Sequence, residues 1–231
     1  MAALRRALAA AERVAITHES PAVRPGSAGE TVWAELLIDG LTFDLDGLAP
    51  GPGFPIDRPR HLFEAPPELV EKPGEALALG PGQHLAGGRA TLPVVRAQLA
   101  LGAELLRVFP GITALSWPPA RCLMGRGFFL SLVDAWLAGG PFPALGLTAF
   151  RRALDGAVQS EGLAFFTGQE LHFDPVAFPD PVEASRIGVR LVHEMVGLGR
   201  LTEPAGLAAP DGAALALRPS RNGRFVRVTR G

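Results

Sequence analysis

The 231-residue chain contains one cysteine, Cys122, and no tyrosine. A single thiol excludes a disulfide within the chain and a zinc site built from several cysteines. It also suits a reducing compartment, so the sequence predicts a cytoplasmic protein. Without tyrosine, no mechanism that needs a phenolic acid is available.

The chain also lacks a long uninterrupted apolar run. Residues 7–11 are apolar but are followed at once by Glu12, which is too short a stretch for a secretion signal. The most apolar later stretch, residues 128–147, contains Asp134 and two prolines. A membrane span needs about 20 apolar residues, so we expect no membrane segment.

The chain has almost no net charge, but charges of one sign are concentrated in two segments. The net charge is −1, which gives no reason to expect nucleic acid or an anionic membrane as a partner. Residues 28–88 nevertheless carry ten acids against three bases, and the last fourteen residues carry five arginines and no acid. In a strand Arg224 and Arg227 face opposite sides, so no single basic stripe is expected. The asymmetry leaves open an acid-to-base association within the molecule or between copies.

Hydrophobic residues make up 48% of the chain and charged residues 19%, enough to bury a sizeable core. We expect one α+β domain over residues 1–231, with a sub-boundary in the Pro/Gly-rich stretch 47–60. The expected fold is a mixed, largely antiparallel sheet with two or three helices packed on one face.

The clearest local signal is a hairpin over residues 31–46, where apolar and polar residues alternate around the favoured turn pair Asp39-Gly40. A second clear local signal is the start of a helix at Asp180. Asp180 can cap the helix, Pro181 suits its first turn, and Glu183 can close a capping box. The remaining elements follow from apolar periodicity. They are helices over 92–109 and 127–137, strands over 112–117, 144–150 and 171–173, and a terminal hairpin over 213–229 turning near Asn222-Gly223.

Most catalytic and metal-binding motifs are incomplete. Gly82 and Gly87 have the spacing of a phosphate loop, but Gly88 stands where lysine is required. His193-Glu194 lacks the second histidine of a helical zinc motif, and no serine lies in a Gly-x-Ser-x-Gly elbow. A cluster of Asp39, Asp44 and Asp46 is better explained as a solvated hairpin face than as a cation site. We therefore predict no metal and no cofactor.

The candidate residues that remain lie in two short segments. Arg121 follows Trp117 and two prolines and could lower the pKa of the neighbouring Cys122 thiol. Glu170 and His172 share one side of a predicted strand, where a carboxylate can shift the titration of an imidazole. Trp117, Arg121, Glu170 and His172 are the predicted ligand or partner surface.

The order of elements in residues 92–173 resembles a bacterial family known as domain of unknown function 4261. The likeness rests on the apolar helix 95–109, a strand over 112–117 that ends in Trp-Pro, and a helix that begins with the aromatic residue Phe128. It continues with a strand near 145–147 that is flanked by prolines. The last shared feature is the sequence pattern Gly162-Leu163, Phe166 and Glu170-Leu171. The resemblance implies a bacterial α+β protein and no established catalytic residues.

Three hypotheses of function follow. The first is a non-catalytic binding or protein-interaction module, since each catalytic pattern lacks an essential member. The second is a small hydrolase or transferase that uses Cys122 with a histidine. The third is a subunit that self-associates through its acidic front and basic tail.

Overall fold

A computed structural model describes residues 2–9, 11–20, 32–72, 74–209 and 212–231. The chain is α+β with mostly antiparallel strands, as predicted. It divides into two compact units, which are described separately. Unit 1 comprises Met1–Arg58, Glu64–Leu115 and Gly125–Ala138, and unit 2 comprises Pro59–Phe63, Ser116–Met124 and Gly139–Gly231. One boundary falls after Arg58, within the stretch 47–60, and a single domain over residues 1–231 stays a prediction.

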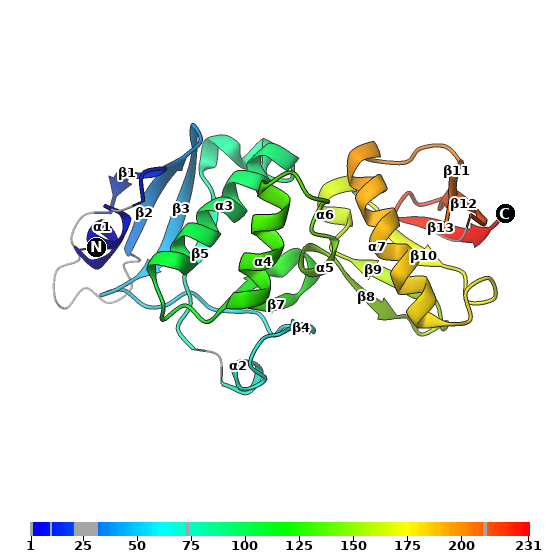
Figure 1. The fold of residues 1–231 in the computed structure, drawn as a ribbon, viewed down its shortest axis with the longest axis horizontal. Helices are drawn as coiled ribbons and strands as arrows, with labels where there is room; N and C mark the ends of the chain where they lie inside the picture. The colour runs from blue at the N-terminus through cyan, green and yellow to red at the C-terminus, as the bar shows by residue number, and fades with distance from the viewer. Residues whose placement is uncertain (1, 10, 21–31, 73, 210–211) are drawn as a thin grey trace. The chain divides into compact units, whose positions relative to one another are not determined.

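Unit 1 is built on an antiparallel sheet of order β1-β2-β3-β5 (Figure 1). Asp39 and Gly40 both have positive φ, as the predicted hairpin turn requires, whereas Thr31 at the start of that hairpin lies outside the described residues. Its strands are β1 (Val14–Glu19), β2 (Val32–Ile38), β3 (Leu41–Leu48) and β5 (Ala78–Pro81), and its helices are α1 (Ala2–Leu8), α2 (Glu68–Glu71), η1 (Gln83–Gly88), α3 (Leu92–Val108) and α4 (Arg126–Leu137).

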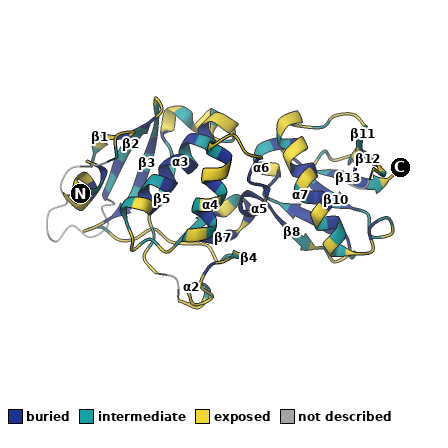
Figure 2. Cartoon of the chain, viewed as in Figure 1, coloured by how far each residue is buried: buried dark blue, intermediate teal, exposed yellow. Residues whose placement is uncertain are grey.

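The core of unit 1 forms where the alternating strands meet α1 and α3. Figure 2 shows buried positions along β2, β3 and α3. Leu36 and Phe43 of the hairpin are fully buried, and Leu101 of α3 is buried in the same cluster. Period-two alternation in a strand and period-3.6 spacing in a helix each produce one apolar side. These sides can leave water together only by packing on each other.

Unit 2 contains a six-stranded sheet of order β11-β12-β13-β10-β9-β8. All neighbours in it are antiparallel except β10 and β13, which run parallel. A small three-stranded sheet has the order β4-β7-β6. The strands are β4 (His61–Phe63), β6 (Ala114–Trp117), β7 (Cys122–Gly125), β8 (Ala149–Arg152), β9 (Val158–Glu161), β10 (Glu170–Phe173), β11 (Ala205–Ala208), β12 (Ala214–Pro219) and β13 (Phe225–Arg230), and the helices are η2 (Pro118–Ala120), α5 (Ala144–Leu147), α6 (Ala164–Thr167) and α7 (Pro181–Leu198).

Helix α7 covers one face of the six-stranded sheet and packs on β8 and β9 (Figure 1). Asp180 caps it as predicted, since the carboxylate accepts a hydrogen bond of 2.9 Å from the backbone N–H of Val182. In the part of the chain that the structure describes, Glu183 makes no capping-box hydrogen bond. Its carboxylate instead binds Arg230 at the end of β13, so the first turn of the helix is fastened to the sheet.

Three details of the predicted fold are corrected. The strands of the described residues form three sheets rather than one. There are more helices than two or three, because several short turns join α3, α4 and α7. The predicted strand 144–150 is a helical turn, α5, followed by β8 from Ala149. Gly146, with φ of 98°, breaks the extended backbone that the apolar run suggested.

Within the described ranges, no helix is both long enough and apolar enough to span a membrane.

The contact between α7 and β8 depends on Gly188. A Cβ at this position would lie 2.4 Å from the ring of Phe150, whereas a Cβ at Gly197 on the same helix would meet nothing within 4 Å. We expect Gly197→Ala to stabilise the protein by up to about 1 kcal/mol, because alanine is the better helix former. Gly188→Ala should destabilise it by about 1–3 kcal/mol, because overpacking outweighs the same gain. Urea unfolding of both variants measures the difference, and equal stabilisation by both would contradict the packing.

Candidate functional site

The predicted residues Glu170 and His172 both lie on β10, on the face of the sheet opposite α7. The neighbouring residues Leu171 and Phe173 are fully buried on the α7 side, as the alternation of a strand requires. The structure therefore places Glu170 and His172 on one face, as the sequence indicated. We call this side the open face.

Glu170 has a structural role on the open face. Its carboxylate accepts hydrogen bonds from the backbone N–H groups of Gly162 (2.9 Å), Leu163 (3.2 Å) and Ala164 (3.0 Å), at the start of α6. Ser160 donates a further hydrogen bond of 2.5 Å to the same carboxylate. The carboxylate thus holds the loop between β9 and α6 to β10, and its acceptor positions are occupied by this chain.

His172 belongs to a row of five polar residues that cross the sheet from strand to strand. The register pairs Arg151 with Gln159, Gln159 with His172, His172 with Arg227, and Arg227 with Arg218. Directly paired residues of adjacent strands project from the same face. These five residues, from β8, β9, β10, β13 and β12, are called the polar row.

One half of the polar row is bonded internally. Arg151 donates to Oε1 of Gln159 over 2.7 Å, which fixes the orientation of the amide. Nε2 of Gln159 then donates to Nδ1 of His172 over 2.9 Å. Because Nδ1 must carry a lone pair to accept this bond, the proton of the neutral ring is on Nε2, which lies 3.7 Å from the carboxylate of Asp155.

The other half of the polar row consists of Arg218 and Arg227, whose guanidinium groups have no acidic partner among the described residues. Arg218 and Arg227 are exposed and directly opposite each other, and among the described residues neither side chain makes an ion pair or a hydrogen bond. Like charges directly opposite on a sheet repel. Arg224 lies in the turn before β13, so the expectation that Arg224 and Arg227 face opposite sides of a strand stays a prediction. Spacing along one strand does not show that Arg218 comes beside Arg227.

Trp117 is buried, with an exposed fraction of 5%, and its ring packs against Phe165 and Phe166. Its indole N–H is a buried donor without a hydrogen-bond partner in the described part of the chain. Arg121 is exposed and has a left-handed backbone, with φ of 51°. Its carbonyl accepts from the N–H groups of Arg60 (2.8 Å) and His61 (3.1 Å), so the loop after Trp117 is held to the segment before β4.

Cys122 does acquire a histidine and a carboxylate as neighbours. Parallel pairing of β4 and β7 places His61 beside Cys122, and Nε2 of His61 lies 3.0 Å from the carboxylate of Glu161, which Arg60 also contacts. The thiol itself is fully buried and directs its proton to the carbonyl of Ala120, at 3.4 Å. Burial, with a smaller contribution from the charge of Glu161, raises the pKa of the Cys122 thiol to about 12. This environment stabilises the thiol and not the thiolate that a nucleophile requires.

The three aspartates of the unit 1 hairpin have different surroundings. Asp39 is exposed and pairs with Arg13 at 2.9 Å, whereas Asp44 and Asp46 lie on β3. Burial and the charge of Asp44 raise the pKa of Asp46. Among the described residues, no group of three or more histidine, cysteine, aspartate or glutamate side chains has an arrangement that could hold a metal ion.

Unit 1 has a shallow hollow of about 340 Å³ between the end of the β2–β3 hairpin and the helices α3 and α4. Its polar side chains are already engaged. Arg13 binds Asp39, and Arg96 donates to the carbonyl of Leu137 over 2.7 Å while lying over the ring of Trp136. The hollow therefore offers few free groups to a ligand.

Comparison with other proteins adds no assignment. The chain matches no family model, and no curated protein or solved structure is significantly similar to it. The resemblance to the bacterial family over residues 92–173 stays a prediction.

The environment of Cys122 predicts an inert thiol. We expect the native protein to react with a thiol reagent at pH 8 only as fast as it unfolds, because a pKa of about 12 leaves about one molecule in ten thousand as thiolate. The same protein in denaturant should react immediately. Rapid reaction of the folded protein would contradict this and would favour the hypothesis of a cysteine hydrolase or transferase.

The same pKa gives a dependence of stability on pH. On unfolding, the pKa of the thiol falls from about 12 to its ordinary value of 9.0. The unfolded chain therefore releases a proton above pH 9 that the folded chain keeps, so Cys122 makes stability decrease with rising pH by up to about 1.4 kcal/mol per pH unit. Cys122→Ala, measured by urea unfolding between pH 8 and pH 10, should lack this decrease.

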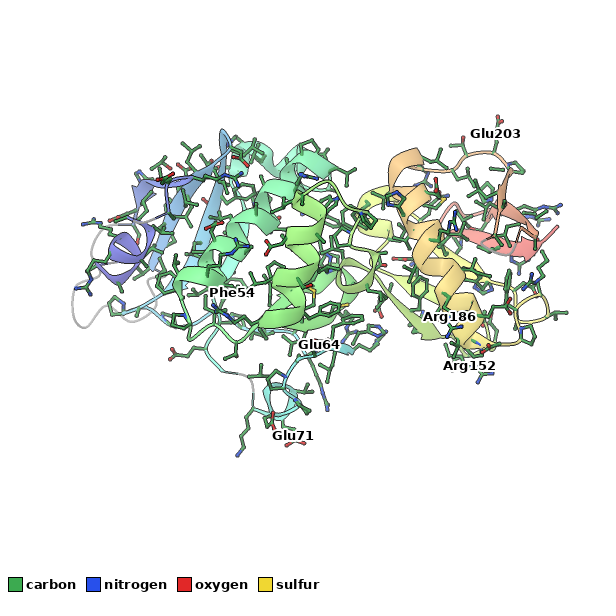
Figure 3. All side chains as sticks on the ribbon, viewed as in Figure 1. Phe54, Glu64, Glu71, Arg152, Arg186 and Glu203 are labelled. Carbon is green, nitrogen blue, oxygen red and sulfur yellow. The ribbon has the colours of Figure 1, made fainter. Side chains whose placement is uncertain are left out.

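The contacts of Glu170 predict a loss of stability on neutralisation. Glu170→Gln replaces a carboxylate acceptor by an amide, whose NH₂ group faces backbone donors, and should destabilise the protein by about 1–3 kcal/mol. Glu203, exposed and labelled in Figure 3, supplies the control, because Glu203→Gln makes the same change at the surface and should have little effect. Equal effects in urea unfolding would contradict the structural role of Glu170.

Proposed function

We propose that the protein is a non-catalytic binding module that takes an acidic group of a protein partner on the open face of unit 2. The observation that carries the proposal is the pair Arg218 and Arg227. These two exposed guanidinium groups face each other on adjacent strands, with no acidic partner among the described residues. A carboxylate placed between them would replace a repulsion by two charge-assisted hydrogen bonds.

The surroundings of the pair favour a short acidic group over a long polyanion. Phe225 lies on the same face of β13, two residues before Arg227. Its ring is 6.1 Å from that of His172 and offers an apolar contact beside the arginines. Glu161 and Glu170 also lie on this face. Their negative charges oppose a nucleic acid laid across the sheet but leave room for one carboxylate of a protein at β12 and β13.

The internally bonded half of the polar row supports this surface. Arg151, Gln159 and His172 form a chain of hydrogen bonds that holds the imidazole in one orientation. A recognition surface binds more tightly when its side chains are ordered beforehand, because less conformational entropy is lost on binding. The free thiol of Cys122 further supports a reducing compartment, and we place the module in the cytoplasm.

The catalytic alternative, with Cys122 as nucleophile, has weaker support. His61 makes its hydrogen bond to Glu161, and no hydrogen bond joins it to the Cys122 sulfur in the described part of the chain. A base that does not reach the thiol proton cannot remove it.

The variant Arg227→Glu tests the proposal through opposite effects on stability and binding. It turns the repulsive pair into an attractive one and should stabilise the free protein by about 0.2–1 kcal/mol. It should also abolish the binding of hexaglutamate. This binding is measured from the changes in the backbone NMR chemical shifts of β12 and β13. Arg224→Glu makes the same change in net charge beside the pair, and should leave most of the binding and give no such gain.

Unchanged hexaglutamate binding by Arg227→Glu, or equal loss in both variants, would show that the pair is not the recognition site. A wild-type protein whose β12 and β13 resonances do not shift at low salt would reject an acidic ligand on this face.

A further inference from the structure

Strand β11 is a short edge strand of the six-stranded sheet, and its own four residues carry neither of the side-chain types that protect edges, charges and prolines. Its sequence, Ala205-Gly206-Leu207-Ala208, contains no charge and no proline. The opposite edge, β8, carries two arginines, of which Arg152 is exposed (Figure 3). Natural edge strands usually carry charges, prolines or bulges because an unprotected edge pairs with another strand.

The hydrogen-bonding phase of β11 shows which groups are free to pair. Ala209 donates to the carbonyl of Ala213 over 2.8 Å, so the alternation of an antiparallel ladder continues with Leu207 and Ala205 bonded to β12. Gly206 and Ala208 then direct their N–H and C=O groups to the outer edge. Within the described part of the chain, no strand pairs with that edge.

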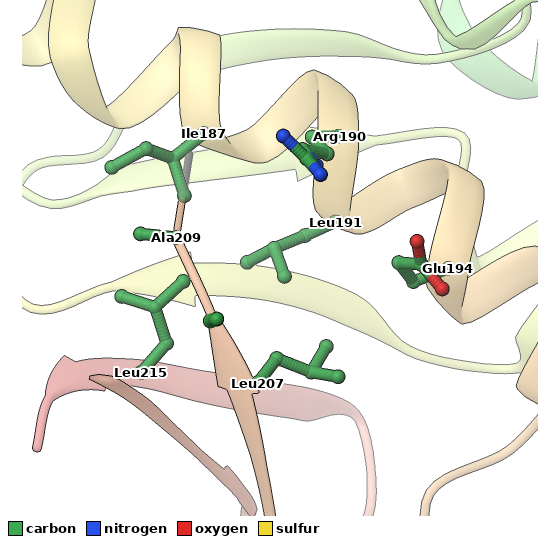
Figure 4. A pocket seen from close by; sticks show the side chains of 8 residues that line it. Ile187, Arg190, Leu191, Glu194, Leu207, Ala209 and Leu215 are labelled. Carbon is green, nitrogen blue, oxygen red and sulfur yellow. The ribbon is translucent and has the colours of Figure 1, made fainter. Parts of the chain in front are cut away.

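A groove of about 150 Å³ lies between this edge and α7 (Figure 4). Ile187, Leu191, Leu207 and Leu215 form its apolar floor, and Arg190 and Glu194 of α7 stand on its rim. The two rim residues have opposite charges and are one helical turn apart. Neither makes an ion pair among the described residues, so both are available to a partner.

We propose that this edge pairs with β11 of a second copy across a two-fold axis at Leu207. Gly206 of each copy then pairs with Ala208 of the other, which satisfies the free N–H and C=O groups of both residues with four hydrogen bonds. The two Leu207 side chains lie next to each other over the apolar floors of the grooves. The sheet of unit 2 becomes twelve-stranded.

The charges on the rim identify a second copy as the occupant. Under a two-fold axis, Arg190 of one copy faces Glu194 of the other, and the reverse pair forms by symmetry. One arginine and one glutamate on the same helix are therefore self-complementary, as an isologous interface requires. An unrelated peptide would pair with the edge but has no reason to match both rim charges.

Sedimentation velocity of the full chain measures the association. We expect a species of twice the 24.2 kDa chain mass at micromolar concentration. Ala208→Pro removes an outward N–H and no hydrogen bond of the monomer, so the variant should fold and be monomeric. Circular dichroism and urea unfolding verify that it folds.

A charge swap tests the rim independently of the backbone. Arg190→Glu places two glutamates opposite each other at both ends and should weaken dimerisation by about tenfold or more. The double variant Arg190→Glu with Glu194→Arg restores opposite charges and should restore the dimer. Arg186→Glu makes the same charge change on α7, outside the residues that line the groove, and should leave the affinity unchanged.

Three results would overturn the proposal. The first is a monomeric wild-type chain throughout the accessible concentration range. The second is a dimer that survives Ala208→Pro, which would place the contact elsewhere, for example between the acidic hairpin and the basic tail. The third is a double swap that fails to restore the dimer lost in Arg190→Glu. None of these results bears on whether Arg218 and Arg227 bind an acidic group.

Discussion

Unit 2 depends on one constraint, which is that helix α7 is narrower than the six-stranded sheet that it packs on. An α-helix is about 10 Å wide, whereas six strands at about 4.8 Å spacing span about 24 Å. Helix α7 packs on β8 and β9 and is fastened at its first turn to β13 by the pair of Glu183 and Arg230. Strands β12 and β11 lie at the other end of this sheet from β8 and β9. Because successive side chains of a strand point to opposite faces, the face opposite α7 carries its own set of residues, and the polar row supplies five consecutive cross-strand neighbours there.

The groups around Cys122 show why proximity alone does not make a catalytic site. A thiol, an imidazole and a carboxylate come from neighbouring strands, yet the electrostatics have the wrong sign. Glu161 contributes negative charge and burial removes water, and both favour the protonated thiol. A cysteine nucleophile needs a nearby cation or helix N-terminus that favours the thiolate. The contacts of His61 and Arg60 with Glu161 accordingly form a hydrogen-bonded cluster that holds β4 and the residue before it to β9.

Local signals could be read from the sequence, whereas long-range pairing could not. The turn at Asp39-Gly40, helix α3 and the cap of α7 at Asp180 each depend on a few consecutive residues, and all are present. The parallel pairing of β10 with β13 joins residues more than fifty positions apart, and no local pattern contains it. Strand β9 reads Val-Gln-Ser-Glu and resembles a loop, because Ser160 and Gln159 are buried by hydrogen bonds rather than by apolar packing. Glu170 and His172 were recognisable as neighbours on one strand, but Gln159 and Arg227, which define the surroundings of His172, come from other strands.

The open face and the β11 edge belong to the same sheet, so the two proposals combine geometrically. In the proposed dimer, β12 of each copy is separated from the axis by one and a half strand spacings, about 7 Å. Arg218 lies three residues along β12 from Leu215, the partner of Leu207, which adds about 10 Å along the strand. The two arginine pairs would then lie about 25 Å apart on one continuous face. A partner with two acidic groups at this separation would bind the second pair at a high effective concentration, so a module with a weak individual contact would gain affinity by pairing its edges.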